Sequence, residues 1–275
     1  MISSVIDVTS FEQPGLEHYR SLRRSCEHRE KGIFIAEGNK VVERFLADDA
    51  ELVSILLTDT WLATLRENLE QRPEPVTVFR APGHLFRSIV GFNYHQGILA
   101  VGKIPPSPSL STLCSSPTTP VLFVAFDDLN SAENTGAIIR NCAACGVQAI
   151  ISGPGSSDPW LRRSVRNSMG TIFKTAIHYS GDLAETLAEL RKGYGFHCIA
   201  AHLSEQSISM HNVNFSGNCC IVFGNEHEGV CRKVLNECDE IAVIPMQAGV
   251  NSFNVACASA IMLYEAFRRR TTTVP

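Results

Sequence analysis

Cys219-Cys-Ile-Val-Phe-Gly-Asn-Glu226 carries the clearest fold signal in the sequence, because a continuous apolar run ends in a glycine, an amide and a carboxylate. Two other patches have the same form: Asn134-Thr-Gly136 with Arg140, and Ile244-Pro-Met246 running to Ser252-Phe-Asn254. Each lies where a strand-like run gives way to a helix-like run. Because α/β proteins keep their chemistry at the carboxyl ends of parallel strands, the sequence predicts an enzyme.

The second half of the chain alternates regularly between the two kinds of run. Strand-like runs cover residues 121–126, 148–152, 197–201, 219–223 and 241–245, and helix-like runs begin near Asn134, Pro159, Asp182, Glu228 and Ser252. Continuous apolar strands are typical of parallel sheets that are covered on both faces. The predicted fold class of residues 121–275 is therefore α/β, with a doubly wound parallel sheet.

The first half predicts a separate small α/β domain over residues 1–103. Helix-like runs at 16–28, 39–47, 61–70 and 84–89 alternate with strand-like runs at 32–36, 52–58, 76–80 and 97–102. Residues 104–120 are rich in proline and serine, which favour extended backbone and do not sustain a helix. We expect this stretch to be the linker between two domains.

Composition narrows the class of protein. The 275 residues carry a net charge of −4, which argues against coating nucleic acid by charge alone. No run approaches the ~20 apolar residues of a membrane span, and the start lacks the features of a signal peptide, so a cytoplasmic protein with no membrane partner is expected. The ten cysteines are then expected to be reduced. Cys142 and Cys145 have C-x-x-C spacing, for which a zinc or redox site and simple burial in a helix are the alternatives.

Two arginine clusters are candidate RNA contacts. Arg20, Arg23 and Arg24 form one, and Arg162, Arg163 and Arg166 form the other, near Trp160. The alternative for either cluster is a solvated helix face.

Asn134 and Arg140 lie six residues apart at the start of one predicted helix, where the positive end of the helix dipole favours phosphate. Alternatively, Asn134 caps the helix and Arg140 forms a surface ion pair. A dinucleotide site is disfavoured, because residues 127–136 follow the first predicted strand with a single glycine.

In order, the three patches resemble the motifs of the SpoU/TrmH branch of the SPOUT RNA methyltransferases. The matching residues are Asn-x-Gly-x-x-x-Arg at 134–140, Phe-Gly-Asn-Glu-x-x-Gly at 223–229, and Ile-Pro-Met-x-x-Gly-x-x-Ser-Phe-Asn-Val-Ala at 244–256. Phe253 is a departure, because the family more often has leucine there. The N-terminal part is similar to the family's ribosomal-protein-L30e-like module, in Tyr19-Arg-Ser-Leu-Arg-Arg, Phe34-Ile-Ala-Glu-Gly and Gln96-Gly-Ile-Leu-Ala-Val.

The resemblance implies a deep trefoil knot, an exception to the rule that folds avoid threading. It also implies a homodimer that binds S-adenosylmethionine without metal and methylates a ribose 2′-hydroxyl in structured RNA. The implied cofactor contacts are Gly224, Asn225, Ile244, Met246 and Phe253. The implied catalytic residues are Arg140, which acts on the hydroxyl, with Asn134, Glu226, Ser252 and Asn254. The RNA-contact residues expected are Arg20, Arg23, Arg24 and Arg166.

Two alternatives stay open at this point. One is a catalytically silent, dimeric RNA-binding protein of the same fold, and the other is an enzyme that methylates a base. Ribosomal RNA is favoured over transfer RNA as the substrate, because the L30e-like domain adds a reader of structured loops.

Overall fold

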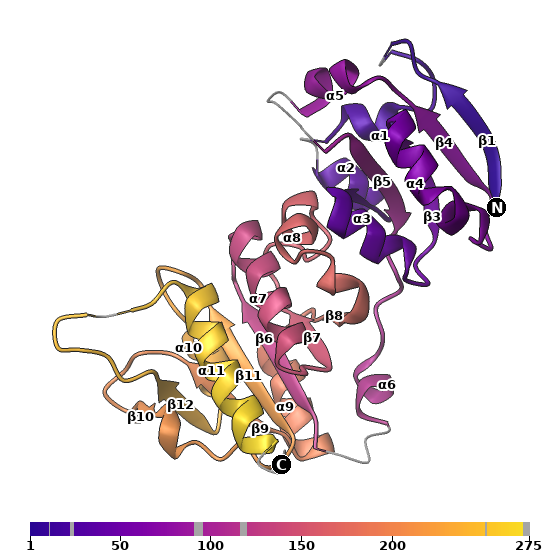
Figure 1. The fold of residues 1–275 in the computed structure, drawn as a ribbon. Coiled ribbons are helices and arrows are strands. Elements are labelled where there is room, and N and C mark those ends of the chain that lie inside the picture. The colour runs from indigo at the N-terminus through magenta and orange to yellow at the C-terminus, as the bar shows by residue number, and fades with distance from the viewer. Residues whose placement is uncertain (11, 23–24, 91–95, 116–119, 251, 272–275) are drawn as a thin grey trace. The chain divides into compact units, whose positions relative to one another are not determined.

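The computed structural model describes residues 1–10, 12–22, 25–90, 96–115, 120–250 and 252–271. It divides into two compact units (Figure 1). The first comprises Met1–Pro106 and Trp160–Phe173, and the second comprises Ser107–Pro159 and Lys174–Pro275. The expectation that residues 121–275 form one unit differs from this division, because residues 160–173 pack with the first.

The first unit is built on a five-stranded mixed sheet with the order β1-β4-β3-β5-β2. Its strands are β1 (Ile2–Asp7), β2 (Ile33–Glu37), β3 (Leu52–Leu57), β4 (Val76–Arg80) and β5 (Ile98–Lys103). Its helices are α1 (Glu17–Arg20), α2 (Ser25–Glu30), α3 (Asn39–Leu46), α4 (Asp59–Glu70), α5 (Gly83–Val90) and α8 (Arg162–Asn167). β1, β4 and β3 run parallel, whereas β5 is antiparallel to both of its neighbours. The carboxyl end of β5 therefore lies at the opposite edge of this sheet from the carboxyl ends of its two neighbours.

Segment 160–173 completes the core of the first unit. The Phe34 ring lies 5.0 Å from Trp160 between centroids, and Phe45 stacks on Phe173 at 5.2 Å. Glu37, at the end of β2 and 1% exposed, accepts hydrogen bonds from Arg162 and, at 2.8 Å, from Arg166. The segment is thus fastened by aromatic packing and by a buried carboxylate shared between two arginines.

The second unit contains a seven-stranded parallel sheet with the order β10-β12-β9-β11-β6-β7-β8. Its strands are β6 (Leu122–Asp127), β7 (Ala149–Ser152), β8 (Ala176–Tyr179), β9 (His197–Ala201), β10 (Ile208–Ser209), β11 (Cys219–Gly224) and β12 (Glu240–Val243). Its α-helices are α6 (Leu110–Cys114), α7 (Ala132–Ala144), α9 (Leu183–Tyr194), α10 (Arg232–Leu235) and α11 (Val255–Arg270). The α/β fold with a parallel sheet is as predicted.

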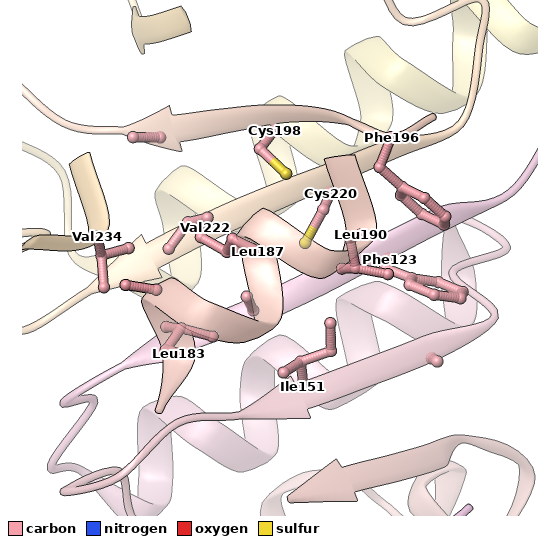
Figure 2. Close-up of a cluster of buried hydrophobic side chains, with 14 of the residues drawn as sticks. Phe123, Ile151, Leu183, Leu187, Leu190, Phe196, Cys198, Cys220, Val222 and Val234 are labelled. Atoms are coloured by element: carbon pink, nitrogen blue, oxygen red, sulfur yellow. The ribbon is translucent and has the colours of Figure 1, made fainter. Parts of the chain in front are cut away.

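Helices cover both faces of this sheet because its central strands are buried along their whole length. On one face, Leu183, Leu187 and Leu190 of α9 pack over Phe123 and its neighbours (Figure 2). On the other face, α7 and α11 lie side by side. Because the strands are parallel, those that precede the sequence patches all end at one edge of the sheet.

Several boundaries differ from the sequence predictions. The predicted helix 16–28 is two short helices, α1 and α2. The predicted linker contains α6, because Ser109 caps this turn and Leu110 is buried in the core of the second unit, so the prediction of no helix there is wrong. Strands β1, β8 and β10 are additional to those predicted.

Candidate active site

A cavity of about 630 Å³ lies at the carboxyl edge of the seven-stranded sheet. Its lining comes from the ends of β9, β11 and β12, from the loop after β11, and from the start of α11. The predicted site residues in the lining are Gly224, Asn225, Glu226, Ile244, Met246, Ser252, Phe253 and Asn254. Eight of the ten predicted catalytic and cofactor residues are thus brought to one cavity.

The loop at residues 224–229 forms a tight wall of this cavity. The backbones of Asn225 and Gly229 exchange two hydrogen bonds, of 3.0 and 2.9 Å. A Cβ atom at Gly224 would overlap the Gly229 carbonyl group, and Gly229 has a φ of +71°. Only glycine fits both positions, the first for close approach and the second for its backbone conformation.

The Asn225 side chain is used within the protein. Its Nδ2 donates to the backbone and carboxylate oxygens of Asp128, at 3.0 and 3.2 Å. Its Oδ1 accepts from the backbone N–H groups of His227 and Glu228. Asn225 therefore shapes the loop, and it offers its backbone to the cavity.

Asn134 connects two sides of the site. Its Nδ2 donates to Glu226 Oε1 at 2.8 Å, and its Oδ1 accepts from Asn254 Nδ2 at 3.1 Å. Ser131, and not Asn134, caps α7, so the Asn134 side chain is available for this bridge. These three residues form a continuous chain of polar contacts along the cavity edge.

Asn254 is also the N-cap of α11, and its Oδ1 accepts from the N–H groups of Ala256 and Cys257. The prediction that this helix begins at Ser252 is therefore wrong by three residues. Ser252 and Phe253 precede the helix and line the cavity, and Phe253 is 45% exposed.

Arg140 lies on α7 with its side chain exposed and does not line the cavity. Within the described part of the chain, no group forms a hydrogen bond or ion pair with its guanidinium. The next residue, Asn141, donates to Ala256 O and Ser259 Oγ, both at 2.9 Å, and so holds α7 against α11. Arg140 therefore lies on a helix that is anchored by Asn141, and its own side chain is outside the cavity of its own chain.

Two residues of the site were not predicted. Asp127, 8% exposed at the end of β6, accepts from the N–H of Cys231 at 2.7 Å. His202, which follows β9, lines the cavity and accepts from the N–H of Val230 at 3.2 Å. Both are polar residues at the end of an apolar run, which is the signal that singled out Glu226.

The predicted RNA contacts belong to the first unit. Arg20 pairs with Glu12 and Glu17, each at 3.6 Å, and Arg166 pairs with Glu37. Arg23 and Arg24 lie outside the described residues. The charges of Arg20 and Arg166 are therefore partly balanced by neighbouring carboxylates.

The C-x-x-C pair lies at the end of α7. Cys142 is fully buried, and burial raises the pKa of its thiol. A search of the described residues finds no group of three or more histidine, cysteine, aspartate or glutamate side chains able to hold a metal ion. The same residues include no helix that is long and apolar enough to cross a membrane.

Comparison with known proteins agrees with this geometry. Residues 121–264, more than half of the chain, match the SpoU rRNA methylase family. An uncharacterized tRNA/rRNA methyltransferase of Mycobacterium bovis is 31% identical over 96% of this chain and 92% of its own. The 23S rRNA (guanosine-2′-O-)-methyltransferase RlmB of Acinetobacter baylyi is 29% identical over 83% of this chain and 94% of its own.

A solved structure is similar over both units. An rRNA methyltransferase from Sinorhizobium meliloti matches with a TM-score of 0.82 and 25% identity, over 98% of this chain and 99% of that one. Family match, relatives and fold agree: the chain belongs to the SpoU rRNA methylase family of RNA methyltransferases.

Proposed function

We propose that the protein transfers a methyl group from S-adenosylmethionine to the 2′-hydroxyl of a ribose in structured RNA, with ribosomal RNA favoured over transfer RNA. The observation that carries the proposal is the polar chain from Glu226 through Asn134 to Asn254, which joins all three motifs at the rim of one cavity. Homology to an RNA 2′-O-methyltransferase supports the reaction type.

The cavity suits this cofactor in size and charge. Its volume lies within the ~300–1,000 Å³ typical of small-molecule sites. The 224–229 loop offers its backbone, Phe253 and Met246 offer apolar contact, and Glu226 and Glu228 favour a cation. The cofactor would supply an activated methyl group on a sulfonium, whose positive charge makes it a good leaving group.

The protein's main contribution is then alignment of the two reactants, which can lower such a barrier by several kcal/mol, on the order of 7–11 in the best cases. Asn134 holds Glu226 and Asn254 in fixed positions. Arg140 binds the phosphate beside the target ribose and stabilises the developing alkoxide. Since arginine keeps its proton in proteins, the hydroxyl proton leaves to phosphate or water.

A homodimer through the second unit explains the position of Arg140 outside its own cavity. Apolar side chains of α11 are exposed, with Tyr264 at 60% and Phe267 at 36%. Burying them against a second copy would carry Arg140 toward the partner's cavity. Sedimentation of the full chain should give a dimer at micromolar concentration, and a monomer would contradict this arrangement.

The deep trefoil knot is part of the same proposal. Support comes from the match of residues 121–264 to the SpoU rRNA methylase family. The loops after β11 and β12 would then be the knotted crossings that enclose the cofactor.

The domain roles follow the same assignment. Residues 1–103 act as an L30e-like RNA-binding domain, residues 104–120 link it, and residues 121–275 carry out methyl transfer. The phosphate contacts are Arg20, Arg23 and Arg24 of the first domain, together with Arg166, whose segment packs with the first unit. Replacing Arg23 and Arg24 together by glutamine should reduce the salt dependence of RNA binding by about one phosphate contact for each arginine. An unchanged slope would remove these residues from the RNA interface.

Methylation of total RNA with labelled cofactor, followed by nuclease digestion, tests the reaction. A nuclease-resistant 2′-O-methyl dinucleotide is expected. A methylated base would contradict ribose chemistry, and no methylation would favour the silent RNA-binding alternative. Calorimetry with S-adenosylhomocysteine tests the cofactor, and EDTA should leave the affinity unchanged.

A further inference from the structure

His202 contacts the loop that forms the opposite wall of the cavity. Its Nδ1 accepts a hydrogen bond from the N–H of Val230, the residue that directly follows the 224–229 loop. Val230 is 2% exposed, so solvent does not readily replace this acceptor. A neutral ring that accepts at Nδ1 carries its proton on Nε2, which is left for other partners.

The ring also supports the loop through its shape. A Cβ atom at Gly229 would overlap the Nδ1 and Cε1 atoms of His202, so ring and backbone are in close contact there. Beyond Val230, the N–H of Cys231 is held by Asp127. The exit of the loop is therefore fixed by two side chains, Asp127 at the end of β6 and His202 directly after β9.

We infer that His202 is a positioning residue of the cofactor site, which holds the 224–230 segment in its binding conformation through the N–H of Val230. The inference rests on the proposed function, because it assumes that this cavity binds S-adenosylmethionine. Loss of the acceptor leaves a buried N–H unsatisfied and releases the loop end, so cofactor affinity falls. Arg140 and Asn134 lie on α7, outside this segment, and saturating cofactor restores the segment with Glu226 in place, so turnover at saturating cofactor should change little.

Two amide substitutions show whether the acceptor at the Nδ1 position is needed, or whether any polar side chain at position 202 is enough. In His202→Asn, the amide Oδ1 lies near the position of Nδ1 and can still accept from Val230. In His202→Gln, the amide oxygen lies farther out, near the position of Nε2, and the acceptor is lost. His211→Gln, at a 58% exposed histidine outside the cavity, is the matched control.

Hydrogen exchange of the Val230 amide in the free protein and calorimetric binding of S-adenosylhomocysteine are the two measurements. We expect His202→Gln to speed exchange at Val230 and to weaken binding about tenfold, and His202→Asn to keep both within about threefold of wild type. The KM for the cofactor should rise in His202→Gln while kcat stays within about twofold.

Wild-type exchange and affinity in the His202→Gln variant would overturn the inference and leave the proposed function standing. Equal losses in both variants would also overturn it, since the Nδ1 acceptor would then not matter. A wild-type protein that fails to bind S-adenosylhomocysteine would overturn the proposed function, and this inference with it.

Discussion

The two sheets of this protein use their carboxylates differently. In the mixed sheet, Glu37 ends β2, is buried, and pairs with two arginines of a segment that comes more than 120 residues later. In the parallel sheet, Glu226 follows β11, is exposed at the rim of a cavity, and accepts from an amide. The Glu37 carboxylate binds two parts of the first unit together, and the Glu226 carboxylate is presented to a cavity.

Strand direction accounts for the difference. The seven parallel strands end at a single edge, so residues from three separate motifs meet there. In the five-stranded sheet, Glu37 ends the edge strand β2, whose neighbour β5 runs antiparallel, so the start of β5 and not its carboxyl end lies beside Glu37. A buried ion cluster in such a sheet can stabilise the unit without forming a site.

Arg140→Ala tests the functional side of this comparison and should have the largest effect. Turnover should fall on the order of 10³-fold, because the group proposed to stabilise the alkoxide is lost. Affinity for S-adenosylhomocysteine should stay within about threefold, since Arg140 does not line the cavity of its own chain and its proposed contact is with the RNA. Steady-state kinetics and calorimetry measure the two, with Arg232→Ala, at another exposed arginine, as the control. Near-normal turnover would refute the proposed mechanism.

Glu37→Gln tests the structural side. Removing the shared carboxylate leaves Arg162 without its counter-charge and should lower the free energy of unfolding by about 3 kcal/mol, at the low end for buried pairs because Arg166 is half exposed. Both tryptophans, Trp61 and Trp160, lie in the first unit, so their fluorescence in urea reports on it.

Glu70→Gln is the control for this change, because Glu70 is exposed and pairs with Arg66 one helical turn away. It should cost no more than about 0.5 kcal/mol. Equal effects of the two substitutions would mean that Glu37 is not the fastening group. If Glu37→Gln lost methyl transfer at full stability, Glu37 would have a functional role as well, and the comparison with Glu226 would fail.

Asn134→Asp tests whether the hydrogen bonds along the cavity rim depend on the amide group of Asn134. The new carboxylate cannot donate to Glu226 and repels it, so kcat/KM should fall about 10- to 100-fold. Asn212→Asp, on the exposed surface of the same unit, should leave kcat/KM unchanged. Wild-type kinetics for Asn134→Asp would show that the hydrogen bonds joining Glu226, Asn134 and Asn254 do not contribute to activity.

The smallest effect concerns Glu265, the counterpart of Glu37 in the second unit. Hydrogen bonds from Arg268 and then Arg269 lower its pKa from 4.5 to about 2. A lowered pKa stabilises the fold above pH 4.5, and this contribution is lost as the pH falls toward 2. Glu265→Gln should flatten the pH dependence in that window, measured by scanning calorimetry of the transition that tryptophan fluorescence does not report. Parallel curves for the two proteins would contradict it.

Much of the second sheet could be predicted because its strands are fully buried, and burial leaves an uninterrupted apolar run such as 219–223. The edge strands β8 and β10 could not, since they are short and half exposed. The division into α1 and α2 was also not predicted, because the apolar spacing over residues 16–28 suits one continuous helix.

The site was predictable as a set of residues but not as a geometry. Asn134 lies 92 residues from Glu226 and 120 from Asn254, so only the fold shows that one amide bridges both. The sequence assigns residues 160–173 to the second domain by position alone, because nothing local to Trp160 and Phe173 indicates Phe34 and Phe45 as partners.

The discontinuous make-up of the first unit has a consequence for synthesis on the ribosome. Residues 1–106 emerge first, but the aromatic rings of Phe34 and Phe45 lack the part of their cover that Trp160 and Phe173 provide until residue 173 has followed. At ordinary elongation rates this delay is roughly 3 to 13 s, long compared with the folding of a small domain. During vectorial synthesis, nascent chains therefore expose an apolar surface that a chaperone can bind, and the order of translation and the order of folding differ in this protein.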